Sequence, residues 1–162
     1  MIFGNPDKFA IYIDEVKDWS YPDFKEGIFA YIIKNQIIPN NCFGISSTLS
    51  SYWSELILHY NSNQDLSREN QYIFELDDIE AYNLLDKMRF SDVDNSQAWT
   101  YSLLVGDMID DSNEVYLVTF NDKEKIFFKA KDTGFITCLE LSKGTIDKVL
   151  LDTYHWCLDN LK

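Results

Sequence analysis

A short acidic stretch holds the residues whose type and spacing could support chemistry. Asp107, Asp110 and Asp111 lie within the sequence GDMIDDSN, between residues 106 and 113. Carboxylates gathered in a polar loop can hold a hard cation such as calcium or magnesium. Their spacing differs from that of an EF-hand, which requires D-x-D-x-D-G and a distal glutamate. A metal-dependent hydrolase that uses this loop is therefore one hypothesis for the function.

Other catalytic patterns are missing from the sequence. It contains no G-x-S-x-G, P-loop, G-x-G-x-x-G or H-E-x-x-H motif. His59 and His155 fall on predicted helices, where a histidine is more often structural than catalytic. Cys138 and Cys157 are expected to be small core residues, and no C-x-x-C pair completes a zinc site. We therefore favour a protein without enzyme activity, cofactor or bound metal.

Acidic residues are concentrated in the middle of the chain. The sequence holds 14 lysines and arginines against 27 aspartates and glutamates, which gives a net charge of −13 at pH 7. Residues 35–122 contain only 3 of these bases and 15 of these acids. Such a field repels nucleic acids and anionic membranes and attracts basic partners. The alternative interpretation is a solvated face that keeps the protein soluble.

Several aromatic residues lie in or beside predicted loops, where the periodicity of a core does not account for them. They are Trp19, Tyr21, Phe24, Trp99 and Tyr101. Aromatic anchors rimmed by charge are typical of protein interfaces, although these rings could equally cover a sheet edge or the open end of the core. Recognition of RNA would need interleaved lysine or arginine, and the intervening charges are mainly acidic.

Hydrophobic patterning predicts an α+β fold. Strands are predicted at residues 9–16, 27–33, 36–38, 72–76, 100–105, 115–120, 125–129 and 135–141. Helices are predicted at about 49–60, from 77 or 78 to 89, and at about 145–160. Since neither a repeat nor a domain boundary is visible, we expect a single domain over residues 1–162. This domain would contain a largely antiparallel β-sheet with about three packed helices.

The composition predicts a soluble, cytoplasmic protein. The 162 residues are 46% hydrophobic and include only 6 glycines and 3 prolines, which argues against disorder. The longest apolar run, residues 28–33, is far shorter than the roughly 20 residues that span a bilayer. The opening MIFGNPDKFA lacks the features of a secretory signal. The sequence contains three cysteines, Cys42, Cys138 and Cys157, and this odd number does not indicate a disulfide framework.

Several stretches resemble a known family. The opening MIFGNPDKFAI with the following YIDEV, the later EGIFAYIIKNQIIP, EVYLVTFNDKEKIFFKAKD (114–132) and FITCLELSKGTIDKVLLDTY (135–154) resemble bacterial polymorphic-toxin immunity proteins of family forty-two. The resemblance covers the amino-terminal quarter and most of the carboxy-terminal third. It implies a small cytoplasmic protein that binds and neutralises the carboxy-terminal effector domain of a toxin, as in contact-dependent growth inhibition. It carries over no catalytic residues.

The resemblance and the charge together lead to a prediction of the toxin-binding residues. A toxin that cleaves nucleic acid needs a basic groove, which an acidic protein can block. The predicted contacts are Asp92, Asp94, Trp99, Tyr101, Asp107, Asp110 and Asp111. The carboxylates would steer association, and Trp99 or Tyr101 would serve as the anchor. Binding to an exosite, the hydrolase described above and an acidic adaptor for a basic host protein remain the alternatives.

Overall fold

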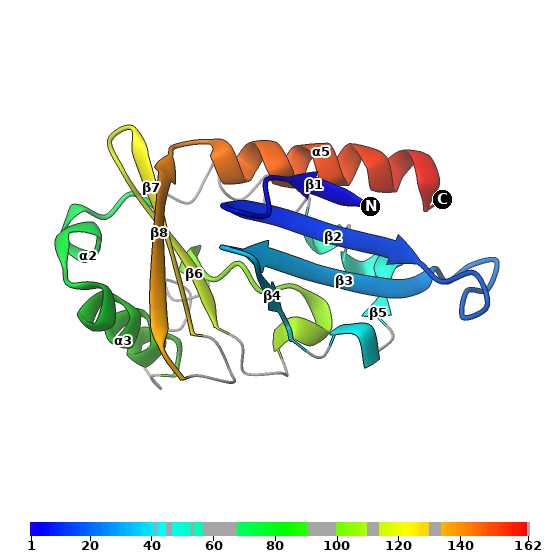
Figure 1. Cartoon of the computed structure of the whole chain (residues 1–162), viewed down its shortest axis with the longest axis horizontal. Coiled ribbons are helices and arrows are strands. Elements are labelled where there is room, and N and C mark those ends of the chain that lie inside the picture. The colour runs from blue at the N-terminus through cyan, green and yellow to red at the C-terminus, as the bar shows by residue number, and fades with distance from the viewer. Residues whose placement is uncertain are drawn as a thin grey trace. The chain divides into compact units, whose positions relative to one another are not determined.

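The computed structural model describes residues 1–40, 42–44, 47–52, 54–56, 68–90, 100–109, 114–129 and 134–161 (Figure 1). The chain divides into two compact units. The first comprises Met1–Tyr60, Val105–Asp111 and Ile146–Lys162, and the second comprises Asn61–Leu104 and Ser112–Thr145. Each unit therefore combines segments that are distant in the sequence. The expectation of one domain over residues 1–162 stays a prediction.

An antiparallel sheet forms the centre of the first unit. Its strands are β1 (Ile2–Gly4), β2 (Phe9–Glu15), β3 (Glu26–Ile33) and β4 (Gln36–Ile38), which neighbour one another in this order, and β5 (Ser47–Thr48), which pairs with β3. Lys34 and Asn35 join β3 to β4 with φ angles of 51° and 62°. Two successive left-handed residues match the twist of a two-residue hairpin. The predicted strands and turn in this region are confirmed.

Helical segments contribute apolar stripes to the first unit. Residues 49–52 and 54–56 are helical, and Leu49, Tyr52 and Leu56 are buried as the spacing predicts. Helix α5 (Thr145–Asn160) has the predicted bounds. It runs beside β1 (Figure 1), where the rings of Phe3 and Trp156 lie 5.9 Å apart. The rest of the first predicted helix, including His59, lies outside the described residues.

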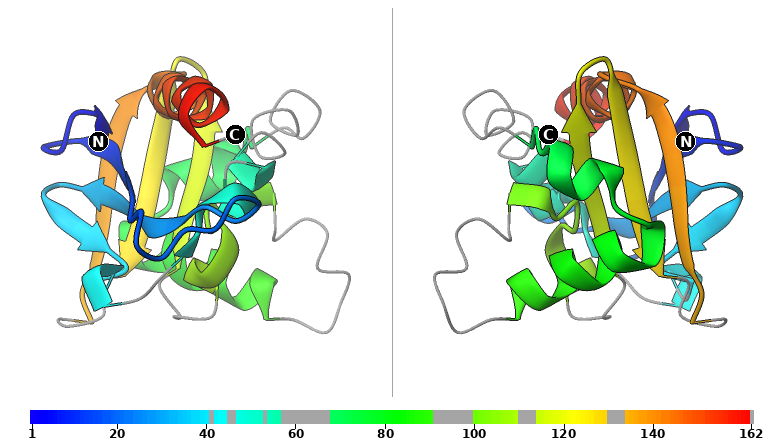
Figure 2. Two further views of the ribbon diagram at one scale, coloured as in Figure 1. Left: turned by 90° about the vertical axis from the view of Figure 1, so that its right-hand side faces the viewer. Right: turned by 90° about the vertical axis from the view of Figure 1, so that its left-hand side faces the viewer.

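The second unit contains a three-stranded antiparallel sheet covered by helices on one face. Strands β6 (Val115–Phe120), β7 (Lys123–Lys129) and β8 (Ile136–Ser142) neighbour one another in that order. Helices α2 (Gln71–Glu75) and α3 (Asp78–Arg89) lie over this sheet (Figure 2). The residues buried between them form a core cluster of Ile73, Phe74, Ala81, Tyr82, Leu85, Tyr101, Tyr116, Val118 and Phe127.

The strand predicted at residues 72–76 is wrong, because this segment forms helix α2. The side chain of Asn70 accepts a hydrogen bond of 3.0 Å from the Ile73 amide and caps the helix. Ile73 and Phe74 are buried, whereas Tyr72 is 68% exposed. Five residues are too few for the hydrophobic period to distinguish a helix from a strand.

The strand predicted at residues 100–105 is also wrong in most of its length. Residues 100 and 101 are helical, and Ser102 makes only an isolated antiparallel bridge with Tyr116. The Leu103 amide then donates to the Val115 carbonyl at 2.9 Å. Leu103 and Leu104 are buried although their backbone is irregular. The apolar run therefore reflects burial and not an extended strand.

The observed elements confirm the α+β class. All pairs of named strands are antiparallel, and the strands lie in two sheets, one in each unit. Helix α3 begins where Asp77 and Asp78 predict, although Ile79, expected on the buried side, is 57% exposed. No helix in the described part of the chain is long and apolar enough to span a membrane.

Candidate functional site

Most of the predicted contact residues lie beyond what the structure describes. Asp92, Asp94, Trp99, Asp110 and Asp111 all lie outside the described residues. The backbone of Asp107 belongs to the 3-10 turn η2 (Gly106–Ile109). The described residues next to two acidic segments, residues 91–99 and 110–113, are held by specific contacts.

Tyr101 is a core residue, which agrees with the interpretation that its ring covers the core and not with an exposed anchor. Its side chain is 7% exposed and belongs to the core cluster of the second unit. Its hydroxyl accepts a hydrogen bond of 3.1 Å from the amide nitrogen of Asn70. Trp19, Tyr21 and Phe24 are exposed as predicted. The sequence could not separate these cases because Tyr101 follows a loop but contacts residues distant in the chain.

A buried ion pair joins the end of α3 to the start of β6. Arg89, the last residue of α3, contacts the carboxylate of Glu114, which directly precedes β6. Their side chains are only 5% and 6% exposed. Residues 91–99 follow Arg89 closely, and residues 110–113 lead directly into Glu114. The pair therefore holds the end of α3 beside the start of β6, within the second unit.

Tyrosines and a further carboxylate surround this end of α3. The Tyr116 hydroxyl donates to the Asp86 carboxylate at 3.3 Å, and the rings of Tyr116 and Tyr82 meet edge to face with centroids 5.5 Å apart. Burial raises the pKa of both hydroxyls, and the negative charge of Asp86 raises each pKa further. Both tyrosines therefore stay protonated over the physiological pH range and serve as uncharged hydrogen-bonding groups beside Arg89.

A second buried arginine, Arg68, holds Thr100, the residue that follows residues 91–99. Arg68 is 6% exposed, and its Nε donates to the Thr100 carbonyl at 2.6 Å. The Arg68 carbonyl accepts from the amide of Thr119 in β6 at 2.9 Å. Arg89 and Thr100, which flank residues 90–99 in the sequence, are thus both held within the second unit.

Gly106 fixes the backbone that precedes Asp107. Its amide donates to the carboxylate of Glu55 at 2.5 Å. Its φ is +52°, and a Cβ atom built there would lie 2.6 Å from Cζ of Tyr52. A residue with a side chain would therefore be strained by its backbone and would also collide with the tyrosine ring. All these contacts lie within the first unit.

Helices α2 and α3 present an acidic surface that the sequence interpretation missed. Glu75, Asp77, Asp78 and Glu80 are all exposed, and the exposed apolar residues Tyr72 and Ile79 lie in the same stretch. Asp77 caps α3 by accepting from the Ile79 amide at 3.0 Å, which confirms its predicted structural role. The missed signal was Tyr72, an aromatic residue assigned to the short strand predicted at residues 72–76.

The described part of the chain contains no group of three or more histidine, cysteine, aspartate or glutamate residues that could hold a metal ion. Burial raises the pKa of the Cys157 thiol to about 12. Burial and the neighbouring charge of Asp78 raise the pKa of the Cys138 thiol to about 12. Both thiols are therefore protonated at neutral pH, as small core residues would be.

Comparisons with known proteins place the chain in a family. The family model Imm42, described as Immunity protein 42, matches residues 1–156. The crystal structure of CdiI from Burkholderia dolosa AUO158 is similar, with a TM-score of 0.80 and 23% sequence identity over 96% of this chain and 99% of that chain. At this identity the likeness establishes the fold. No curated protein matches the chain. The chain belongs to the Immunity protein 42 family.

Proposed function

We propose that this protein binds the effector domain of a cognate toxin and neutralises it without acting as an enzyme. The observation that carries this proposal is the family match over residues 1–156. The fold shared with CdiI is consistent with it. We place the protein in the cytoplasm, where the toxin would act, and in a system of the contact-dependent growth inhibition type.

The proposed binding surface is acidic. Its carboxylates are Asp92, Asp94, Asp107, Asp110 and Asp111, with Trp99 as an aromatic anchor. The attachments at Arg89, Arg68 and Gly106 are consistent with this assignment, because they hold described residues that neighbour these positions in the sequence. Tyr101 is buried in the core cluster of the second unit, so we assign it no direct contact with the toxin.

The proposed mechanism is electrostatic and steric blockade of a basic substrate groove, as a nuclease would present. A groove that binds nucleic acid must neutralise phosphates with lysine and arginine. Carboxylates on the inhibitor attract the same groups over a distance and increase the rate of association. In this proposal the partner is a basic toxin domain and neither a nucleic acid nor a membrane.

Association kinetics test the acidic surface. The triple variant Asp107→Lys, Asp110→Lys, Asp111→Lys should bind the purified effector domain at least about tenfold more slowly at low ionic strength, because steering charge is reversed. Its association rate should also depend less on salt concentration. The control reverses three exposed acids elsewhere, Asp122→Lys, Asp152→Lys, Asp159→Lys, and changes the net charge equally.

The comparison between the two triple variants decides the location of the surface. We expect the control variant to associate within about threefold of the wild type, since the charges it changes do not face the toxin. If both variants associated equally slowly, the net charge of the protein, and not a local acidic surface, would determine the association rate. A wild-type chain that does not bind the effector domain would contradict the proposed function itself.

A further inference from the structure

The connection between β2 and β3 exposes three large aromatic side chains. Trp19, Tyr21 and Phe24 are 40%, 70% and 59% exposed. They lie within six consecutive residues of the first unit. We call residues 16–26 the aromatic loop. Its rings contribute little to the core, because most of the area of Tyr21 and Phe24 remains in water.

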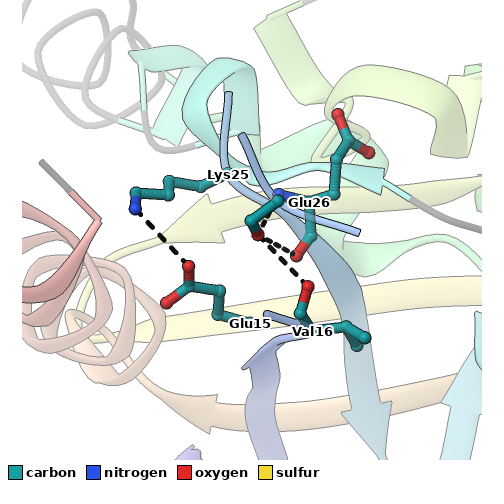
Figure 3. A network of polar contacts seen from close by, with 5 residues as sticks. Glu15, Val16, Lys25 and Glu26 are labelled. Atoms are coloured by element: carbon teal, nitrogen blue, oxygen red, sulfur yellow. Dashed lines mark hydrogen bonds and ion pairs between the residues drawn. The ribbon is translucent and has the colours of Figure 1, made fainter. Parts of the chain in front are cut away.

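Hydrogen bonds hold the aromatic loop in one conformation. The Ser20 hydroxyl lies 3.2 Å from the carbonyl oxygens of Val16 and Glu26, and it accepts from the Glu26 amide at 3.1 Å. Figure 3 shows Val16 and Glu26 meeting at the base of the loop. The Tyr21 amide donates to the Phe24 carbonyl at 2.8 Å, and the Phe24 amide donates to the Tyr21 carbonyl at 3.2 Å. The rings are therefore presented by a backbone already ordered before binding, which lowers the entropic cost of association.

Carboxylates accompany the rings. Asp18 and Asp23 are exposed between the aromatic residues, and neither is in an ion pair with another described residue. Lys25 forms an ion pair with Glu15, in which Nζ and Oε1 are 3.6 Å apart (Figure 3). The aromatic loop itself contains three acids and two bases. The faces of aromatic rings attract cations, and adjacent carboxylates strengthen that preference.

We propose that the aromatic loop is an anchor for the toxin's effector domain that receives lysine or arginine side chains over its rings. This inference rests on the proposed function and adds a second contact surface to it. Charge complementarity selects this occupant, because a protein of net charge −13 repels another copy of itself and attracts a basic domain. Tryptophan and tyrosine held in fixed positions are the residue types that dominate binding energy at protein interfaces.

Equilibrium binding of the purified effector domain, by titration calorimetry or surface plasmon resonance, tests the loop. The effector domain used is the carboxy-terminal domain of the toxin that a gene neighbouring this one is expected to encode. Trp19→Ala, Tyr21→Ala and Phe24→Ala should each raise Kd by at least about fivefold, and at least one of them should raise it by about 30-fold or more. Phe43→Ala is the matched control, because Phe43 is 58% exposed in the same unit and lies on η1 (Cys42–Gly44). It should bind as the wild type does.

A conservative variant separates ring chemistry from apolar area. Phe24→Leu keeps a large apolar side chain but removes the π face, so it should raise Kd by about fivefold. Binding of Phe24→Leu as tight as that of the wild type would overturn the cation–π assignment. If all three alanine variants had the same Kd as Phe43→Ala, the proposal that the aromatic loop is an anchor would be overturned. If the wild type does not bind, the proposed function fails, and this inference fails with it.

Discussion

The aromatic loop of the first unit and the carboxy-terminal end of α3 in the second unit are held by different chemistry. The loop depends on the uncharged Ser20 hydroxyl and on backbone hydrogen bonds. The end of α3 depends on the buried ion pair of Arg89 with Glu114. A neutral hydrogen bond contributes about 1 kcal/mol to stability and responds little to salt. A buried ion pair contributes little net stability, but losing one partner leaves an uncompensated charge.

The difference indicates different structural roles. The loop can be altered without loss of the fold, because its side chains are exposed and its attachments are weak. The ion pair must be complete, and it joins residues 25 positions apart that border two acidic segments. We therefore interpret the pair as a contact that specifies how the end of α3 meets the start of β6, at a cost in tolerance to mutation.

The largest expected effect is on the ion pair. Arg89→Ala should lower the free energy of unfolding by about 3–5 kcal/mol, because Glu114 would remain buried without its partner. Urea unfolding measures this change. The control is Lys143→Ala, which removes an exposed ion pair with Glu69 and should cost at most about 1 kcal/mol.

Replacing both partners of the ion pair tests whether the unpaired charge causes the loss of stability. The double variant Arg89→Met, Glu114→Leu should be clearly more stable than Arg89→Ala, since no buried charge is left unpaired. If Arg89→Ala were as stable as Lys143→Ala, the ion pair would have no special role and the contrast between the two regions would be lost.

A smaller effect is expected at Gly106. Gly106→Ala should cost about 2–4 kcal/mol, from backbone strain at positive φ and from the collision of the new methyl group with Tyr52. Gly134→Ala is the matched control: its φ is +66°, but no described atom lies within 4 Å of the added carbon. It should cost about 1 kcal/mol in the same unfolding measurement. Equal costs at both positions would show that the contact with Tyr52 is relieved without penalty.

The smallest effect is expected at Ser20. Ser20→Ala should lower the free energy of unfolding by about 1–2 kcal/mol and increase hydrogen exchange at the Glu26 amide, which loses its acceptor. Ser51→Ala is the control, because the exposed Ser51 hydroxyl bonds only the Thr48 carbonyl among the described residues. Unchanged exchange at Glu26 in Ser20→Ala would mean that the loop is not ordered by this hydroxyl.

Local patterns predicted much of the fold. Helix α5 was predicted with its observed bounds, because its apolar residues repeat at the helical period over sixteen residues. The turn at Lys34 and Asn35 was predicted because these two polar residues separate the apolar runs at residues 27–33 and 36–38. Helix α2 was missed because five residues show no period, and its cap at Asn70 is a single side chain.

Features that depend on distant contacts could not be predicted. The partnership of Arg89 with Glu114 requires knowing that the end of α3 lies beside the start of β6. Tyr101 was grouped with the aromatic residues beside loops because it follows the loop predicted before it, whereas its burial comes from residues of α2, α3 and β6. The exposed rings of Trp19, Tyr21 and Phe24 were predicted because no local period includes them.

Growth of bacteria that express the neighbouring effector domain tests the central claim most directly. The domain should arrest growth when expressed alone, and co-expression of this protein should restore growth. Rescue should be retained by Phe43→Ala and should weaken when Trp19, Tyr21 and Phe24 are all replaced by alanine. A domain that arrests growth equally with and without this protein would contradict the account.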